Sequence, residues 1–239
     1  MKVNIPVSQI FLTLTDKTIN DFPVFLKSRQ LFRKLTKKYT LFDDKKAEKL
    51  MKKYPEFYSM WKEVPYAIMK VDILRFIILY HYGGFISDLD QFPNVNNLKN
   101  LVDENKFTIF TPRRRFNYEV IYSPQHNEIC LNFLRYVKTQ IEEKSKMKIY
   151  KTWKGRFVLQ TTGPKSFERF IKLYYKNDPS IEFVNVGTIL TKKDAKEVFN
   201  NMNKFPFISL QTSEWLSSIG SKELQTHKKE FVEKLMELF

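Results

Sequence analysis

Cysteine, glycine and histidine are scarce in this 239-residue sequence, which has one, six and three of them. The single cysteine, Cys130, excludes an internal disulfide framework and a cysteine-based zinc site, and it indicates a reducing compartment. The few glycines and the lack of any biased tract exclude a fibrous or disordered chain. The histidines show no metal-ligand spacing. Any metal chemistry must therefore rest on oxygen ligands.

Long hydrophobic runs are also missing. A membrane-spanning helix needs ~18 apolar residues, and the longest candidate, residues 73–79, is interrupted by Arg75. Residues 1–17 have no continuous apolar core and no small-residue cleavage site, so they do not form a signal peptide. We expect a cytoplasmic protein, either soluble or peripherally associated with a membrane.

Acidic residues are outnumbered, since 41 Lys and Arg face 26 Asp and Glu for a formal net charge of +15. A basic chain attracts polyanions such as nucleic acid, anionic lipid and phosphorylated substrates, although a solvated lysine-rich surface is the ordinary interpretation. A non-enzymatic basic module for nucleic acid or membrane stays an alternative. No nucleic-acid motif appears, so we expect no specific nucleic-acid partner.

Strand and helix patterns alternate along the chain. The predicted strands are residues 7–14, 39–42, 85–87, 106–111, 118–123, 157–161, 181–186 and 207–210, and the main predicted helices are residues 24–38, 45–53, 66–82, 129–141, 166–175 and 221–239. This alternation predicts an α/β layered, Rossmann-like fold with a mainly parallel central sheet flanked by helices. With 43% hydrophobic residues and no evident linker, we expect one domain over residues 1–239. Its C-terminal helix, residues 221–239, either packs on the domain or lies on an anionic membrane.

The helix predicted over residues 66–82 is apolar on nearly every face, which predicts that it is buried. Asp72 and Arg75 are its exceptions, and their i, i+3 spacing puts them on one face. Buried charges need partners. The two residues form either a structural ion pair or the polar wall of a pocket for a hydroxylated, phosphorylated ligand.

Asp88 and Asp90 follow the strand predicted over residues 85–87 at alternate positions. Alternate residues of a strand face the same way, so the two carboxylates are placed to share a hard divalent cation such as Mn²⁺ or Mg²⁺. Ligands of such sheets bind at the carboxyl ends of strands. Gly83 and Gly84 permit a tight turn and a close approach to a ligand.

These residues together resemble a known family. The pattern D-I-L-R…Y-x-G-G-F-x-x-D-x-D-x-x-P, which runs from Asp72 to Pro93, is similar to the sugar-binding region of glycosyltransferase family 32. It also resembles the glucosyltransferase domains of the large clostridial toxins. The resemblance implies a GT-A-type fold and transfer of a sugar from a UDP- or GDP-linked donor to a glycan, glycolipid or protein hydroxyl, with retention of anomeric configuration.

The resemblance also implies roles for individual residues. Asp72, Arg75, Asp88 and Asp90 would be the catalytic set, with Asp88 and Asp90 on the metal. Asp72, Arg75, Gly84 and Asp88 would bind the nucleotide sugar.

Two later motifs extend the likeness. Gln211, Ser213 and Trp215 resemble the toxins' N-x-S-x-W element, with Gln in place of the usual Asn. The resemblance implies that Gln211 completes the metal shell and that Ser213 and Trp215 contact the diphosphate. Thr162-Gly163-Pro164 is similar to a T-G-P turn of family 32.

Another enzyme class remains open. The segment from Phe85 to Asp90 also resembles the strand and D-x-D of haloacid-dehalogenase-type phosphatases, in which Asp88 would be the nucleophile and Asp90 the general acid. That family continues with a small and a β-branched residue, whereas this chain continues with Gln91-Phe92-Pro93. In that phosphatase family the aspartates also belong to the first strand, whereas Asp88 and Asp90 follow a later predicted strand. Both differences favour the glycosyltransferase interpretation.

Overall fold

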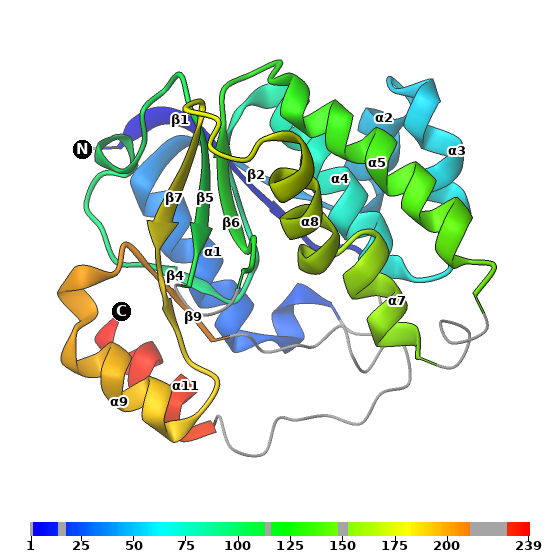
Figure 1. Ribbon diagram of the computed structural model, residues 1–239. Helices are drawn as coiled ribbons and strands as arrows, with labels where there is room; N and C mark the ends of the chain where they lie inside the picture. The colour runs from blue at the N-terminus through cyan, green and yellow to red at the C-terminus, as the bar shows by residue number, and fades with distance from the viewer. Residues whose placement is uncertain (1, 14–17, 113–115, 148–152, 211–228) are drawn as a thin grey trace.

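The computed structural model describes residues 2–13, 18–112, 116–147, 153–210 and 229–239 (Figure 1). Nine strands form a six-stranded sheet of order β2-β1-β3-β6-β5-β7 and a three-stranded sheet of order β4-β9-β8 in this part of the chain. They are β1 (Val3–Ile10), β2 (Thr36–Phe42), β3 (Gly84–Ser87), β4 (Gln91–Pro93), β5 (Phe107–Thr111), β6 (Val120–Ser123), β7 (Ile181–Asn185), β8 (Gly187–Thr188) and β9 (Phe207–Ser209). Within the large sheet β6 alone runs antiparallel to its neighbours β3 and β5, and the other pairs are parallel. The mainly parallel sheet expected from the sequence is therefore confirmed.

Helices cover both faces of the large sheet (Figure 1). They are α1 (Pro23–Leu35), α2 (Asp44–Met51), α3 (Pro55–Glu63), α4 (Ala67–Tyr82), α5 (Glu128–Lys144), α7 (Lys154–Thr161), α8 (Pro164–Tyr174), α9 (Lys192–Asn200) and α11 (Lys229–Leu238), with short 3-10 turns at Ile19–Asp21, Leu98–Leu101 and Met202–Lys204. α4, α5, α7 and α8 lie on one face and α1 on the other. None of the helices in the described ranges is long and apolar enough to cross a membrane.

The alternation of side chains along the central strands builds two cores. In β3, Ile86 packs with α4 and α5 while Phe85 packs with Phe32 of α1 on the opposite face. In β6, Ile121 and Tyr122 divide in the same way, as the two-residue period of a strand requires. The central sheet is thus buried on both sides, which fixes the ends of its strands as the places where polar chemistry can occur.

The small sheet has a core of its own. Phe92 of β4 and Ile208 of β9 pack with Leu235 of α11, all of them fully buried. The C-terminal helix therefore packs on the protein itself over Lys229–Leu238. The rest of the predicted helix, residues 221–228, lies outside the described residues.

One predicted strand is wrong. Residues 157–161 lie in α7, where Phe157, Val158 and Thr161 are buried. That i, i+1, i+4 spacing is one face of a helix. The run is short and apolar, and periodicity alone does not separate a buried strand from a buried helix over so few residues. The helix predicted over residues 24–38 also ends earlier, at Leu35, because Thr36 already belongs to β2.

Candidate active site

The two aspartates lie at the carboxyl end of β3, the central strand that also pairs with β1. The strand ends at Ser87, and Asp88, Leu89 and Asp90 form the turn into β4. The strand ends where the sequence predicts, and the two carboxylates lie beyond it, where the chain leaves the large sheet and joins the small one. The amide N–H of Asp88 donates to the Glu119 carbonyl at 2.8 Å, and Gln9 Nε2 donates to the Asp88 carbonyl at 3.1 Å. These bonds hold the turn at the end of the sheet.

Arg75 connects this turn with helix α4. Its guanidinium forms an ion pair with Asp88 Oδ1 and donates through NH1 to the Tyr118 carbonyl at 3.2 Å. It also lies 5.1 Å from the centroid of the Tyr118 ring. Arg75 is 3% exposed, whereas the Asp88 side chain is 35% exposed. The carboxylate therefore faces outward from the pair.

The Arg75 Nε atom is buried and has no hydrogen-bond partner among the residues that the structure describes. A buried donor without a partner is costly, so this atom is an unsatisfied polar group within the cluster.

Asp72 joins the same cluster from one turn earlier in α4. Its Oδ2 atom accepts from Thr162 Oγ1 at 2.8 Å, and the Tyr118 hydroxyl donates to the Thr162 carbonyl at 2.8 Å. Burial raises the pKa of Asp72 to about 6, although the charge of Arg75 opposes that shift. The structure brings Asp72, Arg75 and Asp88 together, and it brings the Thr162-Gly163-Pro164 turn to them.

Asp90 is 9% exposed and bonds to two parts of the small sheet. Its Oδ1 atom accepts from Gln91 Nε2 at 3.3 Å, and its carbonyl accepts from the Leu210 N–H at 3.2 Å. The chain therefore leaves β9 directly beside Asp90. Three of the predicted site residues, Gln211, Ser213 and Trp215, follow that point and lie outside the described residues.

Glu119 is a residue of this site that the sequence reasoning missed. Its carboxylate accepts hydrogen bonds from Gln91, Asn117 and Ser209. Burial, with the nearby charges of Asp90 and Asp88, raises the pKa of Glu119. The signal was present in the sequence, because Glu119 is the one charged residue within the otherwise uncharged segment 116–123.

Gly84 is not gathered with the aspartates. It lies at the start of β3 with a φ of +81°, and a Cβ atom there would lie 2.2 Å from the Pro6 carbonyl oxygen. Gly83 has a φ of +62° and closes α4. Contact with β1 thus accounts for the glycine at 84, and its role in donor binding stays a prediction.

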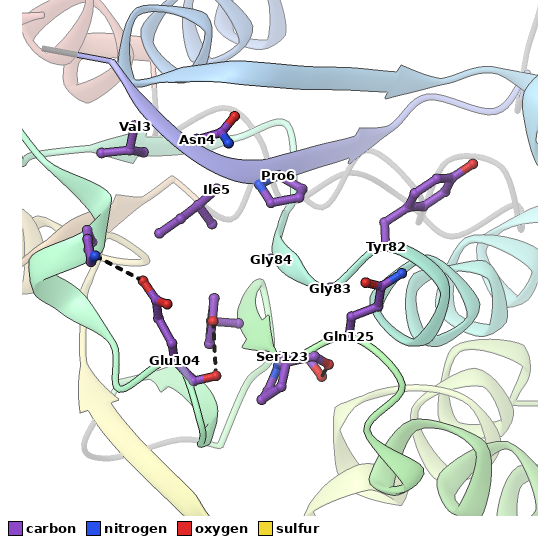
Figure 2. A pocket seen from close by; sticks show the side chains of 13 residues that line it. Val3, Asn4, Ile5, Pro6, Tyr82, Gly83, Gly84, Glu104, Ser123 and Gln125 are labelled. Atoms are coloured by element: carbon purple, nitrogen blue, oxygen red, sulfur yellow. Dashed lines mark hydrogen bonds and ion pairs between the residues drawn. The ribbon is translucent and has the colours of Figure 1, made fainter.

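A pocket of about 430 Å³ lies beside this glycine pair (Figure 2). It is lined by the first residues of β1, by Tyr82, Gly83 and Gly84, by Ser123 at the end of β6 and by Gln125 just after that strand. β1 and β3 start at this edge of the sheet, whereas the aspartates follow the other end of β3. Because ligands of such sheets bind at the carboxyl ends of strands, we assign the candidate site to the aspartates and not to this pocket.

The side chains at the aspartates fit a hard divalent cation in type, since carboxylate oxygens are its preferred ligands. The described residues contain no group of three or more His, Cys, Asp or Glu arranged to hold a metal ion. A metal role for Asp88 and Asp90 therefore stays a prediction.

Comparisons with known proteins agree with this geometry. Residues 8–108 match the family model of the glycosyltransferase sugar-binding region containing a DXD motif. The chain is similar to mannosyl phosphorylinositol ceramide synthase CSH1 of Saccharomyces cerevisiae, with 37% identity over 76 residues that cover 30% of this chain and 20% of that protein. It is also similar to inositol phosphoceramide mannosyltransferase 3 of Schizosaccharomyces pombe, with 40% identity over 48 residues that cover 20% of this chain and 14% of that protein. Both matches thus span a small part of the relatives' lengths.

A solved structure shows the same fold. The PaToxG glycosyltransferase superposes with a TM-score of 0.51 at 13% identity, and the alignment covers 97% of this chain and 84% of that one. The expected GT-A-type fold is confirmed. Residues 8–108 are therefore similar in sequence to a glycosyltransferase sugar-binding region, and Asp88-Leu89-Asp90, called the DXD turn below, lies within the matched range.

Proposed function

We propose that the chain is a metal-dependent glycosyltransferase that moves a sugar from a nucleotide-diphosphate donor to a hydroxyl acceptor. The observation that carries this proposal is the ion pair between Arg75 of α4 and Asp88 of the DXD turn. It joins the two halves of the sugar-binding pattern at the edge of the sheet where nucleotides bind.

Donor binding is divided among the clustered side chains. Arg75, held by Asp88 and the Tyr118 carbonyl, donates from its guanidinium to a sugar hydroxyl or a phosphate oxygen. Asp72, held by Thr162, accepts from a second sugar hydroxyl. Two polar contacts on one sugar ring fix its orientation relative to the diphosphate, which supplies the positioning that transfer between two bound substrates requires.

Asp90 and Asp88 would hold the divalent cation, Mn²⁺ or Mg²⁺, and Gln211 would contribute a further oxygen. When bound, the cation neutralises charge on the leaving diphosphate. Ser213 and Trp215 contact that diphosphate. These three roles rest on the resemblance of the Q-x-S-x-W element, and the bond from Leu210 N–H to the Asp90 carbonyl supports them because the segment starts there.

The base of the donor lies against Phe11. Phe11 directly follows β1 at the same edge of the sheet as the aspartates, and its ring packs 6.2 Å from Phe22 and 6.5 Å from Phe25 between centroids. All three rings are half-buried. A partly exposed aromatic group offers the face that base stacking needs.

Transfer proceeds with retention. The bond between the anomeric carbon and the diphosphate oxygen breaks, the acceptor oxygen bonds to the same face of that carbon, and its proton passes to the departing diphosphate. The acceptor is a glycan, glycolipid or protein hydroxyl. The names of the two yeast relatives, a mannosyl-transferring pair that acts on inositol phosphoceramide, make a mannose donor and a glycolipid acceptor the first to test.

The experiment is an incubation of the protein with Mn²⁺ or Mg²⁺ and a panel of UDP- and GDP-linked sugars, with release of nucleoside diphosphate as the readout. One donor should be consumed, and a chelator or the Asp90→Ala substitution should abolish its consumption. Asp103→Asn is the matched control, because Asp103 is an exposed carboxylate before the start of β5, at the opposite edge of the sheet. Folded protein that ignores every donor, or an Asp90→Ala variant of full activity, would refute the proposal.

A further inference from the structure

Glu119 lies where the two sheets meet. Its backbone carbonyl accepts from the Asp88 N–H of the DXD turn at 2.8 Å. Its side chain accepts from Gln91 of β4 at 2.5 Å and from Ser209 of β9, both through Oε2. Gln91 and Ser209 are direct register partners in the small sheet. One carboxylate oxygen therefore binds both members of a cross-strand pair.

The same Gln91 amide links Glu119 with Asp90. Gln91 Nε2 donates both to Glu119 Oε2 and, at 3.3 Å, to Asp90 Oδ1. Gln91 is fully buried, so its amide cannot exchange these two carboxylate partners for water. The Asp90 carboxylate is thus linked through Gln91 to Glu119.

Placing the Glu119 carboxylate at this junction is energetically unfavourable, which suggests that it has a role beyond joining the two sheets. A carboxylate partly removed from water and set beside Asp88 and Asp90 is disfavoured by desolvation and by like charge. A link between two sheets needs no charge, because apolar side chains serve as well or better. The hydrogen bonds from Gln91 and Ser209 favour the carboxylate form of Glu119, against burial and the charges of Asp90 and Asp88, which raise its pKa.

We infer that Glu119 is a positioning residue for the cation site: through Gln91 it holds the Asp90 carboxylate in the orientation that binds the divalent cation. This inference rests on the proposed function. Partners that orient metal ligands commonly change metal affinity 10–100-fold when they are removed.

The test is a titration of the full chain with Mn²⁺ alone, followed by electron paramagnetic resonance of the free ion. Glu119→Gln replaces one of the two acceptor oxygens with an N–H₂ donor, so residue 119 can no longer accept from Asn117 and from Gln91 and Ser209 together. The Mn²⁺ dissociation constant should therefore rise about 10–100-fold. Gln91→Met removes the link while leaving the Glu119 carboxylate, and it should give the same loss. Ser209→Ala removes the contact of Glu119 with β9 and leaves the Gln91 link, so its affinity should stay within about threefold of the wild type.

A second readout separates positioning from a structural role. With the responding donor, saturating Mn²⁺ should restore turnover of Glu119→Gln, because Asp90 itself is intact, while the half-saturating Mn²⁺ concentration rises. Thermal unfolding of each variant checks that it is folded.

Three outcomes overturn the inference. In the first, folded Glu119→Gln and Gln91→Met bind Mn²⁺ like the wild type. In the second, Ser209→Ala loses as much affinity as they do, which makes Glu119 only a connection between the sheets. In the third, the wild type itself binds no Mn²⁺, and then the proposed metal dependence fails as well.

Discussion

Arg75 and Asp88 are the residues on which the candidate site depends. Arg75 is almost completely buried and Asp88 is partly so, and each is the charge partner of the other. Removing one member of a buried ion pair leaves an uncompensated charge, whereas removing both together costs much less. The pair therefore has a measurable signature in stability as well as in activity.

Arg75→Met should lower the free energy of unfolding by about 3 kcal/mol, the lower end for a broken buried pair because Asp88 is partly exposed. Asp88→Asn should also destabilise the fold, since it leaves Arg75 buried without its partner. The double variant should be more stable than the sum of the two losses predicts. Urea denaturation of all four proteins measures this coupling, and strictly additive losses would show that the two charges do not interact.

Asp72 should make stability depend on pH. Its pKa is raised from 3.8 to about 6 in the folded protein by burial, so between these values the folded state holds a proton that the unfolded state releases. The free energy of unfolding therefore falls as the pH rises through this window and does not change further above it on account of Asp72.

Asp72→Asn mimics the protonated carboxyl and removes this dependence. Relative to the wild type, the variant should gain stability as the pH rises from 4 to 7, by at most about 3 kcal/mol. Denaturation in the presence of a chelator at pH 4, 5, 6 and 7 gives the difference. A stability difference that is the same at every pH would contradict the raised pKa.

At the scale of elements, the glycine pair between α4 and β3 determines how the helix meets the sheet. Gly84 takes a φ of +81° and its Cα faces the Pro6 carbonyl of β1. A side chain there meets both an unfavourable backbone conformation and rigid backbone atoms. The ordering of β3 next to β1, and with it the position of Asp88, depends on this close approach.

Gly84→Ala should destabilise the protein by about 3 kcal/mol or more, because backbone strain and a clash with β1 act together. Gly187→Ala is the matched control, since Gly187 lacks a positive φ and its nearest neighbours are ring atoms of Phe205, 3.1 Å from the built Cβ. Gly187→Ala should lower the free energy of unfolding by less than Gly84→Ala does. Thermal unfolding compares them, and equal losses would show that the approach to Pro6 is not limiting.

Helices and strands that have both a clear hydrophobic pattern and a residue that marks where they begin or end were predictable from the sequence. The helix predicted over residues 45–53 appears as Asp44–Met51, with Asp43 accepting from the Lys46 N–H as its N-cap. α4 and β3 follow their apolar runs closely. The strand prediction for residues 157–161 was wrong because packing against α5 and α8 determines whether they form a helix or a strand. A short apolar run does not show which packing it will have.

The site residues that lie close together in the sequence were predictable. Those that come from distant segments of the chain were not. Asp72, Arg75 and Asp88 lie within 17 residues of one another in the sequence, and the structure brings them together. Glu119 and Ser209 reach the aspartates through a strand order that the sequence does not reveal. Thr162 was noticed as part of a turn, and its bond to Asp72 became visible only with the position of α7.

On the scale of the whole molecule, two sheets meet at the DXD turn. The sequence carries a formal net charge of +15. The strand β3 belongs to the large sheet and β4 to the small one, so Asp88 and Asp90 occupy the junction. The charge favours anionic partners, such as the phosphorylated donor proposed above or an anionic membrane surface.

The protein should therefore bind vesicles that contain phosphatidylserine at low ionic strength. This binding should weaken strongly between about 0.1 M and 1 M salt, as the Debye length falls from about 10 Å to about 3 Å. Vesicles of neutral phosphatidylcholine are the control, and the protein should bind them weakly at both salt concentrations. Sedimentation with vesicles measures the bound fraction. Binding that is indifferent to salt, or equal on both lipids, would exclude a charge-driven membrane contact.

The central claim is that Asp88 and Asp90 hold a cation that anchors a nucleotide diphosphate. The most direct measurement is calorimetric titration of UDP and GDP into the wild type and into Asp90→Ala, each with Mn²⁺ or with a chelator. One of the two nucleotides should bind the wild type only when Mn²⁺ is present and should not bind Asp90→Ala under either condition. Equal binding to both proteins, or binding that survives the chelator, would contradict the claim.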